Sequence, residues 1–131
     1  MERYSAKLLF QFRVVTYGRA NRRRTCEERI VVFRARSADD ALKRAKKAGR
    51  TAQHQYKNNT GGTVHFEFVG VLDLQHLGAD CEANEVWYDI KELVTPMERK
   101  GTLVPREDKL TAIAWERGSL SRKNSRKRAA R

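Results

Sequence analysis

The sequence has little cysteine, little proline and no long uninterrupted apolar run. Two cysteines in 131 residues, Cys26 and Cys81, are too few for a disulfide framework, and neither has a Cys or His neighbour at metal-ligand spacing. Arg13, Glu67 and Asp73 interrupt the apolar stretches, which argues against a membrane-spanning helix. The first residues also lack the apolar core of a secretory signal. We therefore expect a cytoplasmic protein with free thiols and no membrane partner.

Recognisable catalytic motifs are also missing. The sequence has no P-loop, no glycine-rich dinucleotide fingerprint and no nucleophile elbow. The histidines His54, His65 and His76 are evenly spaced, but their spacing fits neither one helix face nor a paired metal site. Glu67 close to His65 leaves general acid–base chemistry open as an alternative. We expect a protein that is not an enzyme, with no catalytic residues, no metal and no cofactor.

Charge is abundant and unevenly distributed. Lys and Arg number 28 against 16 Asp and Glu, for a formal net charge of +12. Residues 1–60 carry 16 basic and 5 acidic side chains, residues 61–116 carry 5 and 11, and residues 117–131 carry 7 and 0. Such a pattern favours an acidic partner for the basic segments. The alternative is internal complementarity, with the acidic middle resting against the basic first half.

Two strands are predicted in the first third of the chain. Apolar and polar residues alternate from Tyr4 to Thr16, as in a long strand with one buried face. The run within Cys26–Ala35 is β-branched and aromatic, which is typical of a strand covered on both faces. Between them, residues 17–25 contain Gly, Asn and four arginines and are predicted to form an exposed loop. The two strands should pair as a wide hairpin.

A helix is predicted next, from Ala38 to about Gln55. Ser37 suits the N-cap, and acidic residues follow it in the first turn, where the helix dipole favours negative charge. Small residues at helical spacing form a narrow stripe able to pack closely on a sheet. Gly49 either ends the helix or weakens its middle by about 1 kcal/mol relative to Ala.

Two more strands complete the predicted fold. Alternation over Thr63–Leu74 predicts a third strand, and alternation over Glu85–Lys91 predicts a fourth. The expected class is α+β with the order β-β-α-β-β: a curved antiparallel sheet with one long helix packed on one face. Phe10, Phe12, Phe66 and Phe68 are expected to face the helix stripe. The predicted division of the chain is an α+β domain at residues 1–92, an extension packing on it at 93–117 and a disordered basic tail at 118–131.

One set of apolar residues lacks a predicted partner. Leu9, Val15, Val69 and Val71 fall on the sheet face away from the helix. Residues 103–116 are apolar enough to cover them, with a short helix predicted over Arg106–Glu116. The alternative is a homodimer through that sheet face.

Five stretches of the sequence resemble one family. They are Tyr4–Phe10, Glu27–Val32, Ala41, Tyr56–Asn58 and Phe68–Leu74. Together they look like the bacterial domain of unknown function four-two-eight-eight, over roughly residues 4–92. The resemblance implies a small α+β domain and brings no activity or functional residue. The arginine-rich loop and the tail lie outside the residues that carry it.

Two kinds of function are expected from these observations. The first is a non-enzymatic protein-interaction module, such as an immunity or accessory protein that docks a partner on a sheet edge or on the basic helix. The alternative is non-specific nucleic-acid binding, because phosphate neutralisation needs clustered Lys and Arg. Candidate contacts with an acidic partner come from the loop, the helix and the tail: Arg19, Arg22, Arg23, Arg24, Lys43, Lys47, Arg122, Lys123, Arg126, Lys127 and Arg128.

Overall fold

A computed structural model of the chain describes residues 1–78 and 82–118. It divides into two compact units, Met1–Asp89 and Ile90–Arg131, which are described separately below. No helix within the described residues is long and apolar enough to cross a membrane.

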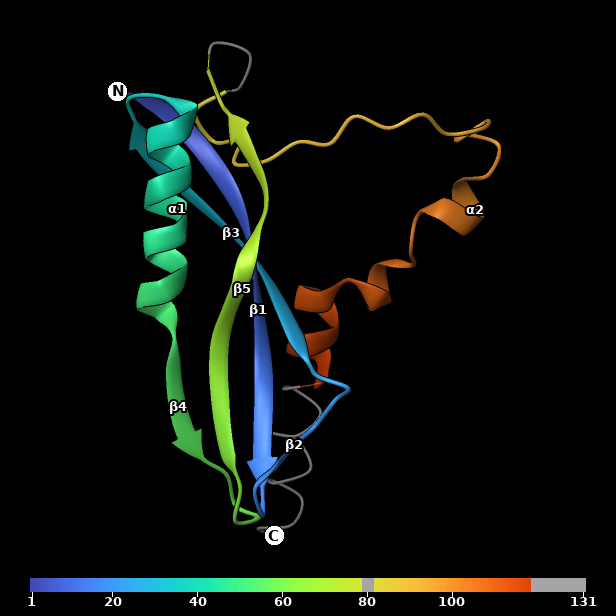
Figure 1. Cartoon of the computed structure of the whole chain (residues 1–131). Coiled ribbons are helices and arrows are strands. Elements are labelled where there is room, and N and C mark those ends of the chain that lie inside the picture. Colours follow the sequence, from blue (N-terminus) through green and yellow to red (C-terminus); the bar gives the residue numbers. More distant parts are fainter. Residues whose placement is uncertain (79–81, 119–131) are drawn as a thin grey trace, which may run out of the picture. The chain divides into compact units, whose positions relative to one another are not determined.

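The first unit is built on a five-stranded antiparallel sheet. Its three long strands are β1 (Glu2–Thr16), β3 (Cys26–Ala35) and β5 (Thr63–His76), and its two short ones are β2 (Arg19–Ala20) and β4 (His54–Lys57). β1 lies between β5 on one side and β3 with β2 on the other, and β4 extends the sheet beyond β5 (Figure 1). The predicted α+β class and antiparallel sheet are confirmed, and the three long strands lie where alternation (β1 and β5) and the β-branched and aromatic run (β3) predicted them.

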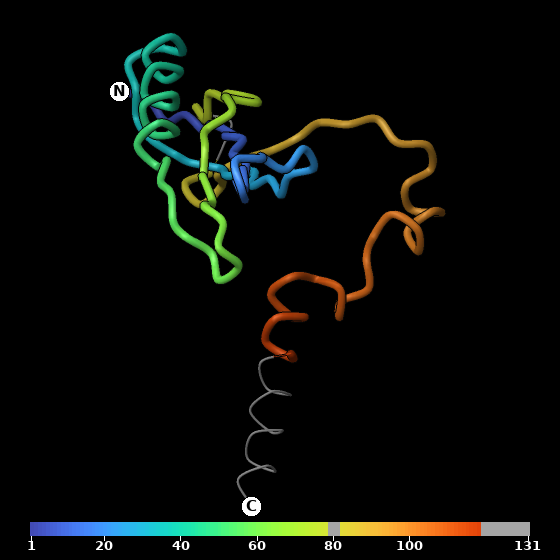
Figure 2. Tube along the Cα trace, turned by 60° about the horizontal axis from the view of Figure 1, so that its bottom comes forward, coloured from blue at the N-terminus to red at the C-terminus, as the bar shows by residue number. Residues whose placement is uncertain are grey.

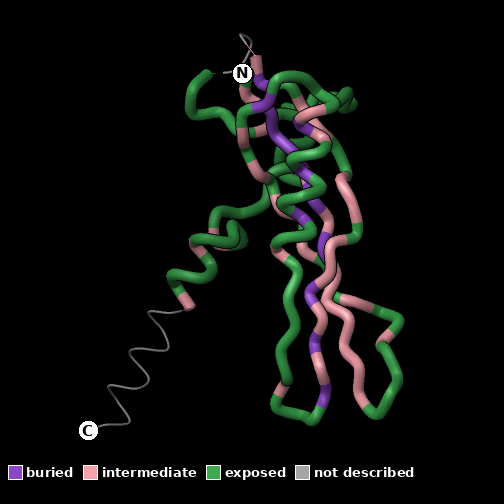
Figure 3. The backbone as a smooth tube through the Cα atoms, turned by 60° about the vertical axis from the view of Figure 1, so that its left-hand side comes forward, coloured by how far each residue is buried: buried purple, intermediate pink, exposed green. Residues whose placement is uncertain are grey.

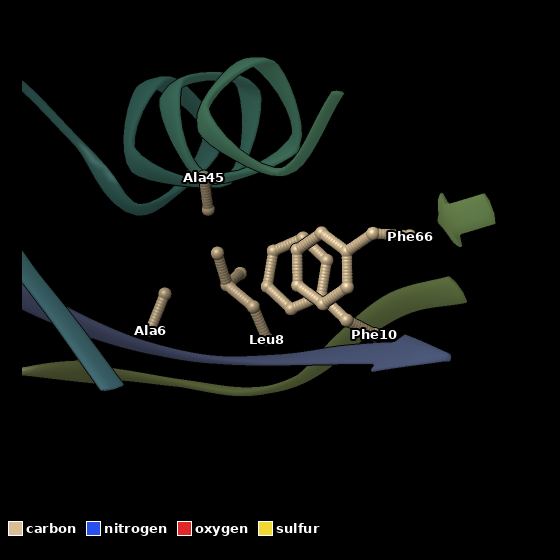
Figure 4. Close-up of a cluster of buried hydrophobic side chains, with 5 residues drawn as sticks. All are labelled: Ala6, Leu8, Phe10, Ala45 and Phe66. Atoms are coloured by element: carbon tan, nitrogen blue, oxygen red, sulfur yellow. The ribbon is translucent and has the colours of Figure 1, made fainter. Parts of the chain in front are cut away.

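Helix α1 (Ala38–Ala52) packs on one face of the sheet and forms a second layer (Figure 2). The Ser37 side chain accepts a hydrogen bond from the Asp40 amide at 3.1 Å, which satisfies a free N–H at the helix start. Ala45 packs on a cluster formed by Ala6, Leu8 and Phe10 of β1 and Phe66 of β5 (Figure 4). The rings of Phe10 and Phe66 stack with their centroids 4.7 Å apart. These side chains form the core between helix and sheet.

Gly49 lies inside α1 and does not end it. A Cβ built on Gly49 would stand 2.4 Å from the ring of Phe68, so only glycine lets the helix approach β5 this closely. Phe68 and Phe12 are partly buried against the core, as expected from their alternation with Phe66. The small residues of α1 therefore set the spacing between the two layers.

The predicted end of the helix is wrong by about one turn. α1 ends at Ala52, and His54–Lys57 forms β4, which pairs with Thr63–Phe66 of β5. Asn58 ties the intervening turn, because its side-chain oxygen accepts the amides of Thr60 and Gly62 at 3.1 and 2.8 Å. Pairing across this turn gives the backbone of residues 54–57 a sheet partner and overrides the helical spacing in the sequence.

The predicted fourth strand at Glu85–Lys91 is also wrong, because these residues form neither a strand nor a helix. Residues 86–88 lie along the sheet face opposite α1. There the Ser5 hydroxyl donates to the Val86 carbonyl at 2.5 Å, and the Gln75 side chain donates to the Tyr88 carbonyl at 2.7 Å. The Lys7 ammonium stands 5.0 Å from the centre of the Trp87 ring. The alternation reflects contact with a sheet face rather than pairing at a sheet edge.

Two bulges in β5 change which residues face the helix. The pairing of β1 with β5 shifts between Lys7 and Leu8 and again between Leu9 and Phe10, which leaves Leu72 and Val69 as extra residues. Both are about half exposed. Val71, predicted on the face away from the helix, packs instead against the core on the helix side. Each bulge inserts one residue and so reverses the alternation beyond it.

The second unit contains α2 (Lys100–Leu103), the 3-10 turn η1 (Glu107–Lys109) and helical residues 111–118. The predicted helix over Arg106–Glu116 is thus only partly correct, because Leu110 adopts an extended conformation between the two helical pieces. An ion pair between Arg106 and Asp108 at 2.8 Å closes the turn.

Candidate functional site

The arginines of the predicted loop have different roles. β1 and β2 are joined by Tyr17 and Gly18, both with positive φ, in a tight two-residue hairpin. Arg24 is held by the loop and by β1, donating to the Asn21 carbonyl at 2.8 Å and to the Gln11 side chain at 3.0 Å. The remaining basic side chains of this hairpin and loop point to solvent. They are Arg19, Arg22 and Arg23.

The basic residues of α1 lie on its solvent side. Lys43 and Lys47 are exposed, whereas Arg44 pairs with Asp40 one turn earlier at 3.2 Å. Arg44 and Lys47 border an open depression of about 700 Å³ that runs beside the helix. Figure 1 shows α1 and the β1–β2 hairpin at different ends of the sheet, so the structure does not bring the two basic groups together. The candidate tail contacts lie outside the described residues: Arg122, Lys123, Arg126, Lys127 and Arg128.

A chain of polar contacts crosses the sheet on the face away from α1. Glu67 accepts two hydrogen bonds from the Arg13 guanidinium, at 2.8 and 3.1 Å, and a third from the Gln11 amide at 3.1 Å. The hydrogen bonds from Arg13 are the main cause that lowers the pKa of Glu67 to about 2, with the Gln11 hydrogen bond and the Arg13 charge adding to it. Glu67 is therefore a stable carboxylate that links β5 to β1.

The histidines are not gathered into a metal site. The His54 ring packs at a tilt against Phe66, with centroids 5.0 Å apart, and His76 stacks on Tyr4 at 4.8 Å and also contacts the Glu2 carboxylate. Across residues 1–78 and 82–118, no three His, Cys, Asp or Glu side chains are grouped closely enough to hold a metal ion. His65 lies beside Glu67, but the carboxylate is engaged by Arg13.

The outer edge of β3 is the most unusual surface of the first unit. β3 pairs with β1 over ten consecutive residues without a register shift. The Phe12 amide donates to the Thr25 carbonyl at 2.9 Å, so these two residues form a hydrogen-bonded pair at the start of the β1–β3 ladder. Because hydrogen-bonded pairs alternate along an antiparallel ladder, the odd-numbered residues of β3 direct their backbone groups to β1. The even-numbered residues of β3 therefore direct their N–H and C=O groups outward. They are Cys26, Glu28, Ile30, Val32 and Arg34.

These outward groups have no protein partner in the described part of the chain: no second strand pairs with β3, and no side chain bonds its outer amides. Ile30 and Val32 are 43% and 40% exposed on this edge. The prediction that β3 is covered on both faces is wrong for these two side chains. Apart from the buried Ala35 at the end of β3, the residues of the edge strands are exposed or intermediate, whereas the buried positions of the sheet follow β1 and β5 (Figure 3).

Sequence reasoning missed this edge because it treated the apolar run Ile30–Phe33 as buried. One signal was present: the charged residues Glu28 and Arg34 lie on either side of the run and on the same face of the strand. Charged residues at both ends of a short β-branched run are typical of a strand at the edge of a sheet.

A known family matches most of the first unit. The family described as Domain of unknown function (DUF4288) matches residues 3–86, which include all but the first residue of β1 and the whole of α1 and β5. The chain belongs to the DUF4288 family. The DUF4288 region also contains β3 and extends to Val86, whose carbonyl accepts the Ser5 hydroxyl. No curated protein and no solved structure matches the chain.

Proposed function

We propose that the chain is a non-enzymatic cytoplasmic protein-interaction domain that binds an extended segment of a partner protein along β3. The observation that carries this proposal is the row of outward backbone groups on β3. The strand is ten residues long, has no bulge and contains neither Pro nor Lys. Strand addition satisfies such groups with main-chain hydrogen bonds, and the alternate side chains provide specificity. Glu28, Ile30, Val32 and Arg34 are the contacts for the partner segment.

The polar contacts of Glu67, on the sheet face away from α1, support a binding function over catalysis. A general base works best when its pKa lies near the working pH. Glu67 has its pKa lowered to about 2 by Arg13, so it takes up a proton poorly near neutral pH. Its contacts to Gln11 and Arg13 fit a role in holding β1 and β5 together.

Nucleic-acid binding is the second candidate, favoured by the exposed arginines of the β1–β2 hairpin. In the described residues, Arg19, Arg22 and Arg23 form no ion pair with an acidic side chain of the first unit. Guanidinium groups of this kind suit phosphate contacts. The β1–β2 hairpin lies at the other end of the sheet from α1, the helix that carries Lys43 and Lys47 (Figure 1), so the two basic groups form no continuous stripe.

A proline at an outward position of β3 tests the protein-binding proposal. The Ile30 amide points away from β1, so Ile30→Pro removes one outward donor and leaves the β1–β3 ladder intact. Ile30→Thr is the matched control, because it keeps the amide and the β-branched shape. Linear peptides selected against the full-length protein from a displayed library supply the probes, with binding measured by fluorescence anisotropy.

We expect the selected peptides to bind wild type and Ile30→Thr similarly and Ile30→Pro at least about tenfold more weakly. Hydrogen exchange should slow at the amides of Glu28, Ile30, Val32 and Arg34 when peptide is bound. Equal binding to Ile30→Pro, or protection elsewhere, contradicts strand addition. A labelled duplex and a labelled single strand test the alternative: binding that weakens steeply with salt and ignores Ile30→Pro would favour the nucleic-acid function.

A further inference from the structure

We propose that the strand added along β3 is β3 of a second copy of this chain, antiparallel and centred on Val31. This inference rests on the proposed function and names its partner. It follows from the backbone direction of β3, from the order of its side chains and from their exposure. Each of these three observations restricts the pairing independently.

The backbone permits only certain registers. Two β3 edges can exchange hydrogen bonds only if outward-directed residues stand opposite one another, and these are the even-numbered ones. Such a pairing is centred on a residue and not between two residues. The central registers are therefore those about Ile30, Val31 or Val32, and each relates the two copies by a two-fold axis.

The side chains select one of these registers. Centred on Val31, the pairing sets Glu28 opposite Arg34 twice and Ile30 opposite Val32 twice. Opposite charges and β-branched side chains directly across from each other both stabilise strand pairs. Centred on Ile30, Glu28 would face Val32, and centred on Val32, Arg34 would face Ile30. Among the outward-directed residues Glu28, Ile30, Val32 and Arg34, only the register about Val31 matches charge with charge and apolar with apolar.

The four side chains of this register are available on the surface. Glu28, Ile30, Val32 and Arg34 are exposed, and they lie on one face of the sheet, opposite α1. The Glu28 carboxylate has no ion-pair partner in the described residues, and the Arg34 guanidinium reaches only the Met1 carbonyl, at 3.5 Å. Joining two such edges makes one continuous ten-stranded sheet, with α1 of both copies on the same side.

Charge reversal tests the proposed pairing. Glu28→Arg sets arginine against Arg34 at both ends of the interface, and Arg34→Glu sets glutamate against Glu28. Sedimentation velocity over a concentration series measures dimerisation of the full-length protein. We expect a wild-type dimer, at least about tenfold weaker dimerisation in each single variant, and recovery in the double variant Glu28→Arg/Arg34→Glu. Thermal melts of each variant confirm that it folds.

Disulfide trapping tests the register. In the Cys26→Ser/Cys81→Ser background, Val31→Cys places two cysteines opposite each other at a non-hydrogen-bonded pair, where Cα atoms stand about 4.5 Å apart. Mild oxidation should yield a covalent dimer. Ile30→Cys is the control, because Ile30 faces Val32 and its two copies are too far apart to bridge. Cross-linking by Ile30→Cys and not by Val31→Cys would overturn the register.

The outcomes separate this inference from the proposed function. A wild-type protein that stays monomeric at every concentration, yet binds peptides in a manner sensitive to Ile30→Pro, overturns self-pairing and keeps strand addition. A dimer that Glu28→Arg leaves unchanged overturns self-pairing through β3. A dimer insensitive to Ile30→Pro in a protein that binds no peptide along β3 overturns both proposals.

Discussion

The two edges of the sheet differ in how their backbone groups are satisfied. On the β5 side, β4 pairs with the first part of the strand, the Gln53 side chain accepts the Phe68 amide at 3.0 Å and the Asp73 carboxylate accepts the Leu74 amide at 2.8 Å. Two bulges further break the regularity of β5. β3 has none of these features. Proteins usually protect their edge strands, so the contrast between a regular, bare edge and a protected one is the feature on which the proposed pairing along β3 rests.

Truncating Phe68 should have the largest effect, because it removes the ring on which α1 rests at the protected side. Phe68→Ala is expected to lower the free energy of unfolding by about 3 kcal/mol, as large aromatic truncations do. At a protein concentration low enough to keep the chain monomeric, Val32→Thr, at the open edge, should change it by no more than about 0.5 kcal/mol. Urea denaturation of both variants at that concentration measures the contrast. Similar losses in the two variants would mean that the β3 edge is already covered within the monomer.

Gly49→Ala tests the close approach of α1 to β5. Alanine favours a helix by about 1 kcal/mol over glycine, but its Cβ would stand 2.4 Å from the Phe68 ring. We expect overpacking to prevail, with a net loss of about 1–2 kcal/mol. In a Phe68→Ala background the same change should stabilise the protein. A double-mutant cycle by thermal or urea unfolding checks the reversal, and no reversal would contradict the contact.

Glu67→Gln tests the ion pair that links β5 to β1 on the protected side. Folding lowers the pKa of Glu67 from 4.5 to about 2, so its contribution is complete above pH 4.5 and is lost as the pH falls toward 2. Because the pair is partly exposed, we expect a loss of about 1 kcal/mol or less at pH 7. The variant should also show a weaker fall in stability between pH 5 and pH 2, measured by thermal melts. An unchanged pH profile would contradict the link.

Gln53→Ala should have the smallest effect and sharpens the comparison most directly. It removes the acceptor of the Phe68 amide, which water can replace at this exposed site, so stability should fall by about 0.5 kcal/mol. The Phe68 amide should exchange its hydrogen faster, while the amides of β3 keep their rates. Hydrogen exchange resolved by NMR measures both, with Gln55→Ala as the matched control. Unchanged exchange at Phe68 would show that Gln53 does not protect this edge.

The parts of the fold that depend on side-chain pattern could be predicted from the sequence. The alternation from Tyr4 to Thr16 predicted which side chains of β1 face the core, and Ser37 predicted the start of α1. Pattern could not reveal the bulges at Val69 and Leu72, because an inserted residue looks like any other until the partner strand is known. It also could not separate β4 from the helix, since the pairing partner of Tyr56 lies beyond a turn.

The candidate site was harder to predict because it consists of backbone groups. A sequence shows that Ile30–Phe33 is apolar, but not that β1 takes only one side of β3 and leaves the other open. The arginines were found by composition alone, and composition could not distinguish Arg24, which holds the loop, from Arg23, which is exposed. Edge position is a property of topology, and the topology depends on contacts between distant parts of the chain.

The central place of β1 also orders the events of folding. Phe10 pairs with Glu27 on one side and with Phe68 on the other, so the β1–β3 hairpin closes a short loop and the β1–β5 pairing a much longer one. Short loops close at a lower entropic cost, and local pairings form sooner. During refolding, β1 and β3 are therefore expected to form a hairpin before β5 pairs with the other edge of β1. In that interval the hairpin has two bare edges, and refolding at high protein concentration should be slower and more prone to aggregation than refolding at low concentration.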